Sequence, residues 1–191
     1  MGSRTSIPLN DEELSSLCEE TKFSHSQLRD LYGRFLELSK DGEFIKRSDM
    51  IRLSDLKSNP LGSRIVDAFF KDSCSDDESM DFTQFVKAAA VFKPQRKHTS
   101  ESALNSADSK LRFIFNIYDL DGDEIISQDE MLSLLKMMVG TSVDAEKLSQ
   151  IADRAVLDGD DDKDGVIGFE DFKKAVSHID ASKLISIRVL D

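Results

Sequence analysis

Residues 119–130 read Asp-Leu-Asp-Gly-Asp-Glu-Ile-Ile-Ser-Gln-Asp-Glu, and residues 160–171 read Asp-Asp-Asp-Lys-Asp-Gly-Val-Ile-Gly-Phe-Glu-Asp. Each stretch places acidic residues at positions 1, 3, 5 and 12 of a twelve-residue loop, and position 7 supplies a main-chain carbonyl. This spacing surrounds one hard cation with oxygen atoms. The alternative, a pair of solvated acidic turns, does not explain why the pattern occurs twice, 41 residues apart and between amphipathic runs. The two stretches therefore predict two calcium sites.

The loop pattern is that of the EF-hand, and it assigns a ligand to each position. We call residues 119–130 loop three and residues 160–171 loop four, because two degenerate copies precede them. In loop three the predicted ligands are Asp119, Asp121, Asp123, Ile125, Ser127 and Glu130. In loop four they are Asp160, Asp162, Asp164, Val166 and Asp171.

Each loop departs from the motif at a position that affects its affinity. Loop three has Glu124 in place of the glycine at position 6, and a left-handed turn there costs roughly 1 kcal/mol. Loop four keeps Gly165 but ends in Asp171, which is one methylene shorter than glutamate. Fewer oxygens at closer range suit magnesium. We predict that loop three is the tighter calcium site and that loop four is weaker or shared between Ca²⁺ and Mg²⁺.

Two degenerate copies of the helix–loop–helix unit come earlier in the chain. Residues 39–49 have basic side chains where ligands belong, and residues 73–84 lack the turn glycine and the final carboxylate, so we predict that both loops are metal-free. Ile45 and Met80 can still pair these loops as short strands, and Ile126 and Ile167 can pair the other two. The predicted fold is all-α, with four EF-hands in two lobes and a two-strand bridge in each lobe.

The predicted organisation has five parts. They are an N-terminal arm (1–24), a first lobe with degenerate EF-hands 1 and 2 (25–92), an exposed linker (93–110), a second lobe with EF-hands 3 and 4 (111–181), and an apolar C-terminal tail (182–191).

Composition excludes several classes of function. The net charge of -12 leaves no basic stripe for phosphates, so we expect no nucleic-acid partner. The three histidines stand alone, and no nucleophile or phosphate loop occurs, so we expect neither an enzyme nor a small-molecule substrate. With two cysteines and no signal peptide or membrane-spanning run, the chain is expected to be cytoplasmic.

The amino terminus carries a candidate lipid site. Gly2 followed by Ser6 fits the N-myristoylation pattern, although a Met-Gly-Ser start is also common in cloned proteins. A single myristoyl chain binds membranes weakly. We therefore expect peripheral association with the inner face of the plasma membrane or of endomembranes, supported by a membrane-bound partner.

Several segments outside the loops resemble the calcineurin B homologous proteins. They are Asp11-Glu12-Glu13-Leu14, Asn59-Pro60-Leu61-Gly62, Ala103-Leu104-Asn105-Ser106, Met137-Met138-Val139-Gly140 and Ser186-Ile187-Arg188-Val189-Leu190. The resemblance covers nearly the whole chain. It implies a myristoylated cytosolic protein with metal in its last two EF-hands. It also implies that an amphipathic juxtamembrane helix of a sodium/proton exchanger is the partner, whose activity or stability the protein supports.

The chain departs from that family in its eroded first two loops, its short linker and Asp171, which identify a divergent member. Two rival functions stay open, namely a calcineurin B-type regulatory subunit of a protein phosphatase and a calcium buffer or sensor with another helical target. Paired EF-hands take a partner helix in an apolar groove. The candidate lining residues are Phe69, Phe85, Phe92, Leu134, Leu135, Met138 and Val176, unless these side chains simply fill the core.

Overall fold

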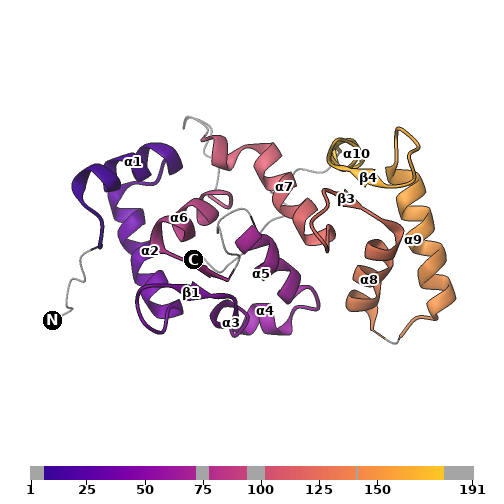
Figure 1. Ribbon diagram of the computed structural model, residues 1–191, viewed down its shortest axis with the longest axis horizontal. Helices are drawn as coiled ribbons and strands as arrows, with labels where there is room; N and C mark the ends of the chain where they lie inside the picture. Colours follow the sequence, from indigo (N-terminus) through magenta and orange to yellow (C-terminus); the bar gives the residue numbers. More distant parts are fainter. Residues whose placement is uncertain (1–6, 72–77, 94–101, 141, 179–191) are drawn as a thin grey trace.

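The computed structural model describes residues 7–71, 78–93, 102–140 and 142–178, which form helices and two short strand pairs (Figure 1). The first lobe contains α1 (Asp11–Thr21), α2 (His25–Leu38), β1 (Ile45–Lys46), α3 (Arg47–Met50), α4 (Ser54–Ser58), α5 (Gly62–Lys71), β2 (Ser79–Met80) and α6 (Phe82–Ala90). After it come η1 (Ala103–Asn105), α7 (Ala107–Tyr118), β3 (Ile125–Ile126), α8 (Gln128–Val139), α9 (Ala145–Gly159), β4 (Ile167–Gly168) and α10 (Phe169–Ala175). The mainly helical fold with paired EF-hands is confirmed.

Helix starts in the first lobe are fixed by short-range capping. Ser24 and Gln27 form a capping box at the start of α2, as do Asp81 and Gln84 at the start of α6. A third capping box, formed by Asn10 and Glu13, starts α1 within the predicted N-terminal arm. That helix packs against α6 and η1 with Thr21 fully buried, so residues 11–21 are part of the first lobe.

Both predicted strand bridges are present. Ile45 pairs with Met80 between β1 and β2, and Ile126 pairs with Ile167 between β3 and β4, both antiparallel. All four side chains are buried. Position 8 of each loop therefore joins its pair of EF-hands through both the main chain and the core.

A continuous aromatic array fills the first lobe and ends on α7. Neighbouring rings have centroids 4.8–6.3 Å apart, mostly in edge or tilted geometry, which favours aromatic pairs. The array runs through Tyr32, Phe82, Phe35, Phe85, Phe69, Phe92 and Phe113.

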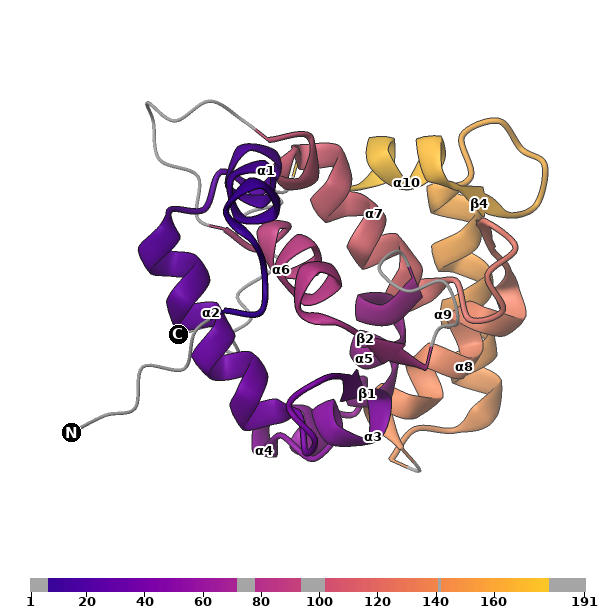
Figure 2. The same cartoon turned by 60° about the vertical axis from the view of Figure 1, so that its left-hand side comes forward.

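Helix α7 belongs to both lobes. Its Phe113 and Ile117 pack into the first core, whereas Phe115 lies at the centre of the second, 5.6 Å from the ring centroids of both Phe169 and Phe172. Figures 1 and 2 show α7 running beside α5 between the first lobe and α8–α10. The two lobes therefore share one helix.

The end of the predicted exposed linker is packed. Residues 94–101 lie outside the described part of the chain, but Ser102, Asn105 and Lys110 are buried. The Ser102 hydroxyl donates to the main-chain oxygen of Glu20 at 2.5 Å, and the Asn105 amide donates to that of Lys93 at 3.0 Å. These long-range bonds explain why polar residues there are not solvated.

Gly62 allows α4 and α5 to meet closely. A Cβ atom at this position would lie 1.9 Å from the main-chain oxygen of Leu56. The turn between the helices is closed by Gly62 N–H donating to the Asn59 carbonyl at 2.8 Å. The start of α5 therefore has no room for a side chain.

Within the described residues, every helix is too short or too polar to cross a bilayer.

Candidate metal centre

Loop three brings three carboxylates together at the junction of α7 and α8. Asp119 caps the end of α7 through N–H donation to Phe115 O, and its side chain is buried, whereas Asp121 and Asp123 are exposed. One carboxylate oxygen from each of the three lies within 4.8 Å of the others. This arrangement of hard oxygen donors fits Ca²⁺.

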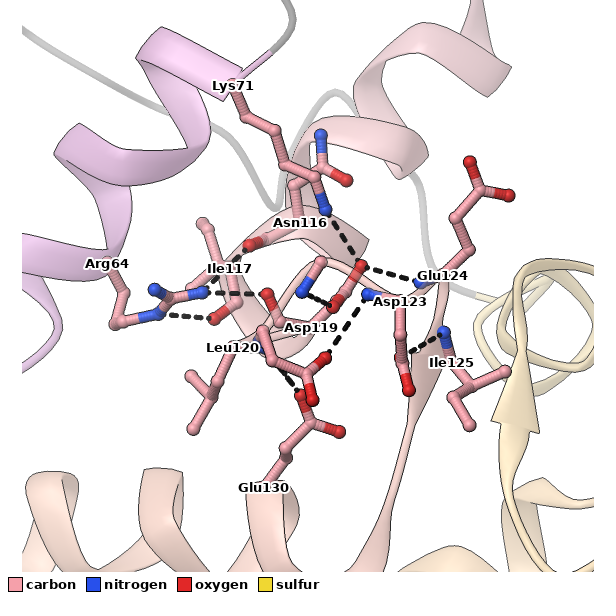
Figure 3. A network of polar contacts seen from close by, with 12 residues as sticks. Arg64, Lys71, Asn116, Ile117, Asp119, Leu120, Asp123, Glu124, Ile125 and Glu130 are labelled. Atoms are coloured by element: carbon pink, nitrogen blue, oxygen red, sulfur yellow. Dashed lines mark hydrogen bonds and ion pairs between the residues drawn. The ribbon is translucent and has the colours of Figure 1, made fainter. Parts of the chain in front are cut away.

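Glu130 reaches across loop three from the first turn of α8 (Figure 3). Its Oε1 accepts a bond from Leu120 N–H at 2.6 Å. Its Oε2 accepts bonds from the Ser127 amide and hydroxyl at 2.8 and 2.7 Å. The carboxylate of the glutamate at position 12 is therefore hydrogen-bonded near both ends of the loop.

Loop four has the same acidic triplet but a shorter final ligand. Oxygens of Asp160, Asp162 and Asp164 also lie within 4.8 Å of one another. The Asp171 carboxylate accepts a bond from Gly168 N–H, only three residues away, at 3.2 Å. Among the described hydrogen bonds, none joins Asp171 to the first residues of its loop, as Glu130 is joined to Leu120. This difference in reach supports the predicted weaker calcium site in loop four.

Left-handed backbone occurs at positions 4 and 6 of both loops. In loop three these are Gly122 (φ 84°) and Glu124 (φ 69°); in loop four they are Lys163 (φ 65°) and Gly165 (φ 94°). Glu124 takes the left-handed turn that its sequence position predicts. The left-handed turn at position 4, where loop four has the non-glycine residue, was not predicted. Each loop therefore bears one such cost, and backbone strain does not separate their affinities.

The acidic triplet of loop four perturbs its own ionisation. Main-chain donation from Gly165 N–H holds the pKa of Asp160 below its ordinary value. Partial desolvation, followed by the nearby charge of Asp164, raises the pKa of Asp162. The rise at Asp162 therefore comes in part from repulsion between like charges of the triplet, and a bound cation would relieve that repulsion.

The first EF-hand loop is bridged by a lysine. Lys40 Nζ lies 3.3 Å from Asp49 Oδ1, and Arg52 lies at the same distance from that oxygen. Residues 73–77 of the second loop lie outside the described part of the chain. Within the described residues, groups of three close carboxylates occur only in loops three and four. That the first loop binds no metal stays a prediction.

The seven predicted groove residues do not line a common surface. Phe69, Phe85 and Leu134 are buried, Met138 is 55% exposed, and the others are half-buried. A cleft of about 400 Å³ lies instead at the meeting point of α5, α6, η1, α7 and α10, and only Phe69 of the predicted set reaches it. Its lining is Ala68, Phe69, Ala88, Val91, Leu104, Asp108, Ser109, Arg112, Phe113 and Phe169. The predicted lipid site Gly2 and the tail lie outside the described residues.

Two basic residues of α5 contact loop three, and neither was predicted from the sequence. Lys71 Nζ lies 2.8 Å from Asp119 Oδ2, and Arg64 donates to the Asp119 main-chain oxygen at 2.8 Å (Figure 3). Neither residue belongs to an EF-hand ligand pattern, and Lys71 is 48 positions before its partner. No local sequence signal marks this contact.

Comparison with known proteins finds relatives of loops three and four and of nearly the whole chain. Residues 108–177 match the EF-hand domain pair. The calcineurin B protein of Naegleria gruberi is 36% identical over 99% of this chain and 100% of its own length. The type 1 calcineurin B protein of Dictyostelium discoideum is 38% identical over 90% of this chain and 89% of its own. The calcineurin B protein of Candida glabrata is 33% identical over 92% and 94%.

Proposed function

Because this chain belongs to the calcineurin B family of EF-hand proteins, we propose that it is a calcium-binding regulatory subunit. Its partner is an amphipathic helix in the catalytic chain of a protein phosphatase. The similarity to proteins named as calcineurin subunits extends over nearly the whole chain, including the degenerate first lobe. A calcium buffer needs neither that lobe nor an apolar cleft. A phosphatase partner is therefore favoured over a sodium/proton exchanger.

The observation that carries the proposal is the apolar cleft of about 400 Å³. This volume is in the range of pockets that bury apolar groups. Most lining side chains are apolar, while Asp108 and Arg112 supply charge on the α7 side. Arg112 also lies 3.6 Å from the ring centroid of Phe169, which joins α7 to the start of α10. An amphipathic helix would insert apolar anchors into the cleft and place polar groups near this charged side.

The metal loops lie close to the cleft along the same helices. Helix α7 contributes Arg112 and Phe113 to the cleft and ends directly before Asp119 of loop three. Helix α10 begins with Phe169 of the cleft and carries Asp171 of loop four. Bound calcium supplies positive charge that neutralises the loop carboxylates. Because α7 and α10 each reach both a metal loop and the cleft, a change in the geometry of the loops changes the geometry of the cleft.

A helix-binding assay with matched glutamate substitutions tests this proposal. The probe is a synthetic amphipathic helix from a calcineurin catalytic chain, titrated with the full chain in calcium. Val91→Glu places a charge in the cleft and should weaken binding at least tenfold. Val139→Glu is the control, because Val139 is exposed on α8 outside the cleft. Equal affinity of the two variants, with both folded by circular dichroism, would reject the cleft as the helix site.

A sodium/proton exchanger helix is the second candidate partner. The observation favouring it is the set of segments resembling calcineurin B homologous proteins, including Asn59-Pro60-Leu61-Gly62. In this alternative the protein is cytoplasmic and peripheral on a membrane, with a myristoyl group on Gly2. Affinity isolation of the tagged full chain from its own cells distinguishes the partners: a phosphatase catalytic chain supports the first, and an exchanger supports the second. Intact-mass measurement of the same sample tests acylation.

A further inference from the structure

Helix α5 of the first lobe attaches to loop three at two points of different chemistry (Figure 3). One attachment binds the main chain, and the other binds a metal ligand. Both come from one face of α5, seven residues apart, at Arg64 and Lys71. The difference between them determines how each should respond when calcium enters the loop.

Arg64 is the attachment that does not involve a ligand side chain. It donates to the main-chain oxygens of Asn116, Ile117 and Asp119 at 3.3, 3.4 and 2.8 Å. These carbonyls lie at the end of α7, where helical hydrogen bonding stops and oxygens need other donors. Arg64 is also paired with Asp67 at 3.0 Å and only 12% of its side chain is exposed. This contact can persist whether or not loop three holds an ion.

Lys71 is the attachment that involves a ligand side chain. Its ammonium group lies 2.8 Å from Oδ2 of Asp119, whose side chain is fully buried, while Lys71 itself is 31% exposed. The ammonium also lies 3.4 Å from where a Cβ would stand on Gly122, so it sits against the loop main chain. Whichever Asp119 oxygen takes an ion, Lys71 is a positive charge beside it. Coulomb repulsion then opposes either the ion or the lysine.

Among the residues that the structure describes, the first ligand of loop four has no contact like that of Lys71, so loop four serves as an internal comparison. Asp160, its first ligand, accepts main-chain bonds from Lys163 and Gly165 at 2.7 and 2.8 Å. Within the part of the chain that the structure describes, Asp160 takes part in no ion pair. In the degenerate first loop, by contrast, Lys40 is paired with the final carboxylate Asp49. A lysine beside a carboxylate at a ligand position thus occurs in a loop predicted to bind no metal, and again in loop three.

We propose that Lys71 is a latch: it holds the first ligand of loop three while the loop is empty, and calcium binding releases it. Release loosens α5 from α7 while Arg64 keeps the two helices aligned. The cleft is lined by Ala68 and Phe69 of α5 and by Phe113 of α7, so loosening that contact opens it to the partner helix. Coupling between two binding events is reciprocal. The factor by which calcium weakens the Lys71–Asp119 ion pair therefore equals the factor by which that ion pair lowers the calcium affinity of loop three.

This inference rests on the proposed calcium binding. Calorimetry tests calcium binding and the role of Lys71 separately. Asp160→Ala leaves loop three as the only intact site in the full chain. In that background, Lys71→Met should lower the calcium dissociation constant by about three- to tenfold. Lys174→Met is the control, because Lys174 pairs at 2.6 Å with the exposed, non-ligand carboxylate of Asp161. It removes the same charge and should change the constant less than twofold.

Three results have distinct meanings. No calcium uptake by the unsubstituted chain would refute the proposed function itself. Normal uptake with an unchanged or weaker affinity in Lys71→Met would refute the latch alone. An equal gain in Lys174→Met would also refute it, because general charge removal would then explain the effect.

A second measurement needs no substitution and so does not depend on the variants folding. The rate of reductive methylation at each lysine is followed by mass spectrometry with calcium and with chelator. Lys71 should react at least threefold faster in calcium. Lys87, paired with Glu20 at 2.9 Å in the first lobe, should not change. Equal rates at Lys71 in the two conditions would show that calcium does not release it.

Discussion

Replacing Gly62 with alanine tests the close contact that sets the position of α5. A Cβ there would lie 1.9 Å from the Leu56 carbonyl oxygen, far inside contact distance, and the clashing atom is main chain that cannot rotate away. The turn between α4 and α5 must therefore shift. Overpacking of this kind costs about 2–3 kcal/mol of unfolding free energy. In a chain of this size, that lowers Tm by roughly 5–10 °C.

Gly33→Ala is the matched control. Gly33 lies in α2, and a Cβ there would meet nothing within 4 Å. Alanine is favoured over glycine inside a helix by about 0.5–1 kcal/mol, so this variant should unfold at a slightly higher temperature. The two substitutions make the same chemical change with opposite predicted signs.

The first lobe has its own optical probe. The chain contains two tyrosines and no tryptophan, so in a Tyr118→Phe background Tyr32 alone reports unfolding. Tyr32 is buried against Phe35 and Phe82. Thermal unfolding is followed by its fluorescence in chelator, so that calcium binding does not add to stability. A Gly62→Ala variant as stable as Gly33→Ala would refute the contact argument.

Four further substitutions test the metal loops and the shared helix. Asp119→Ala should abolish calcium binding at loop three alone, and Asp160→Ala at loop four alone; calorimetry that still finds two filled sites in either variant would contradict the ligand assignment. Asp171→Glu should restore the reach seen for Glu130 and tighten calcium binding at loop four by about tenfold in calorimetry; unchanged affinity would show that reach does not limit the site. Phe113→Ala should cost about 3–5 kcal/mol and lower the unfolding temperature of both lobes, followed by Tyr32 and Tyr118 separately; a shift in one lobe only would refute the coupling of the two lobes through α7.

Local spacing made the loops and bridges predictable. The ligands Asp119 to Glu130 lie within twelve residues, so their sequence order alone places them around one point. Ile126 and Ile167 occupy the same loop position and pair as expected. Even here the left-handed backbone of Lys163 was not predicted, because the motif marks only position 6 for a glycine.

Long-range packing was not predictable from one sequence. Phe85 and Leu134 are as apolar as a groove surface requires, and only their packing shows that they are buried. The cleft joins Ala68 to Leu104 and Phe169, which no periodicity relates. The Lys71–Asp119 pair likewise depends on how α5 meets α7. Sequence patterns identify apolar residues, but tertiary contacts decide which of them face solvent.

Because α7 packs into both lobes, its position affects where the chain can be cut into fragments. The EF-hand pair matched at residues 108–177 begins within α7, so a fragment cut there keeps Phe113 and Ile117 but loses the helices that cover them. Those side chains would then face water on an isolated half-molecule, which favours self-association. Such a fragment should dimerise or precipitate, and calcium titrations on it would report a different assembly from that of the intact polypeptide.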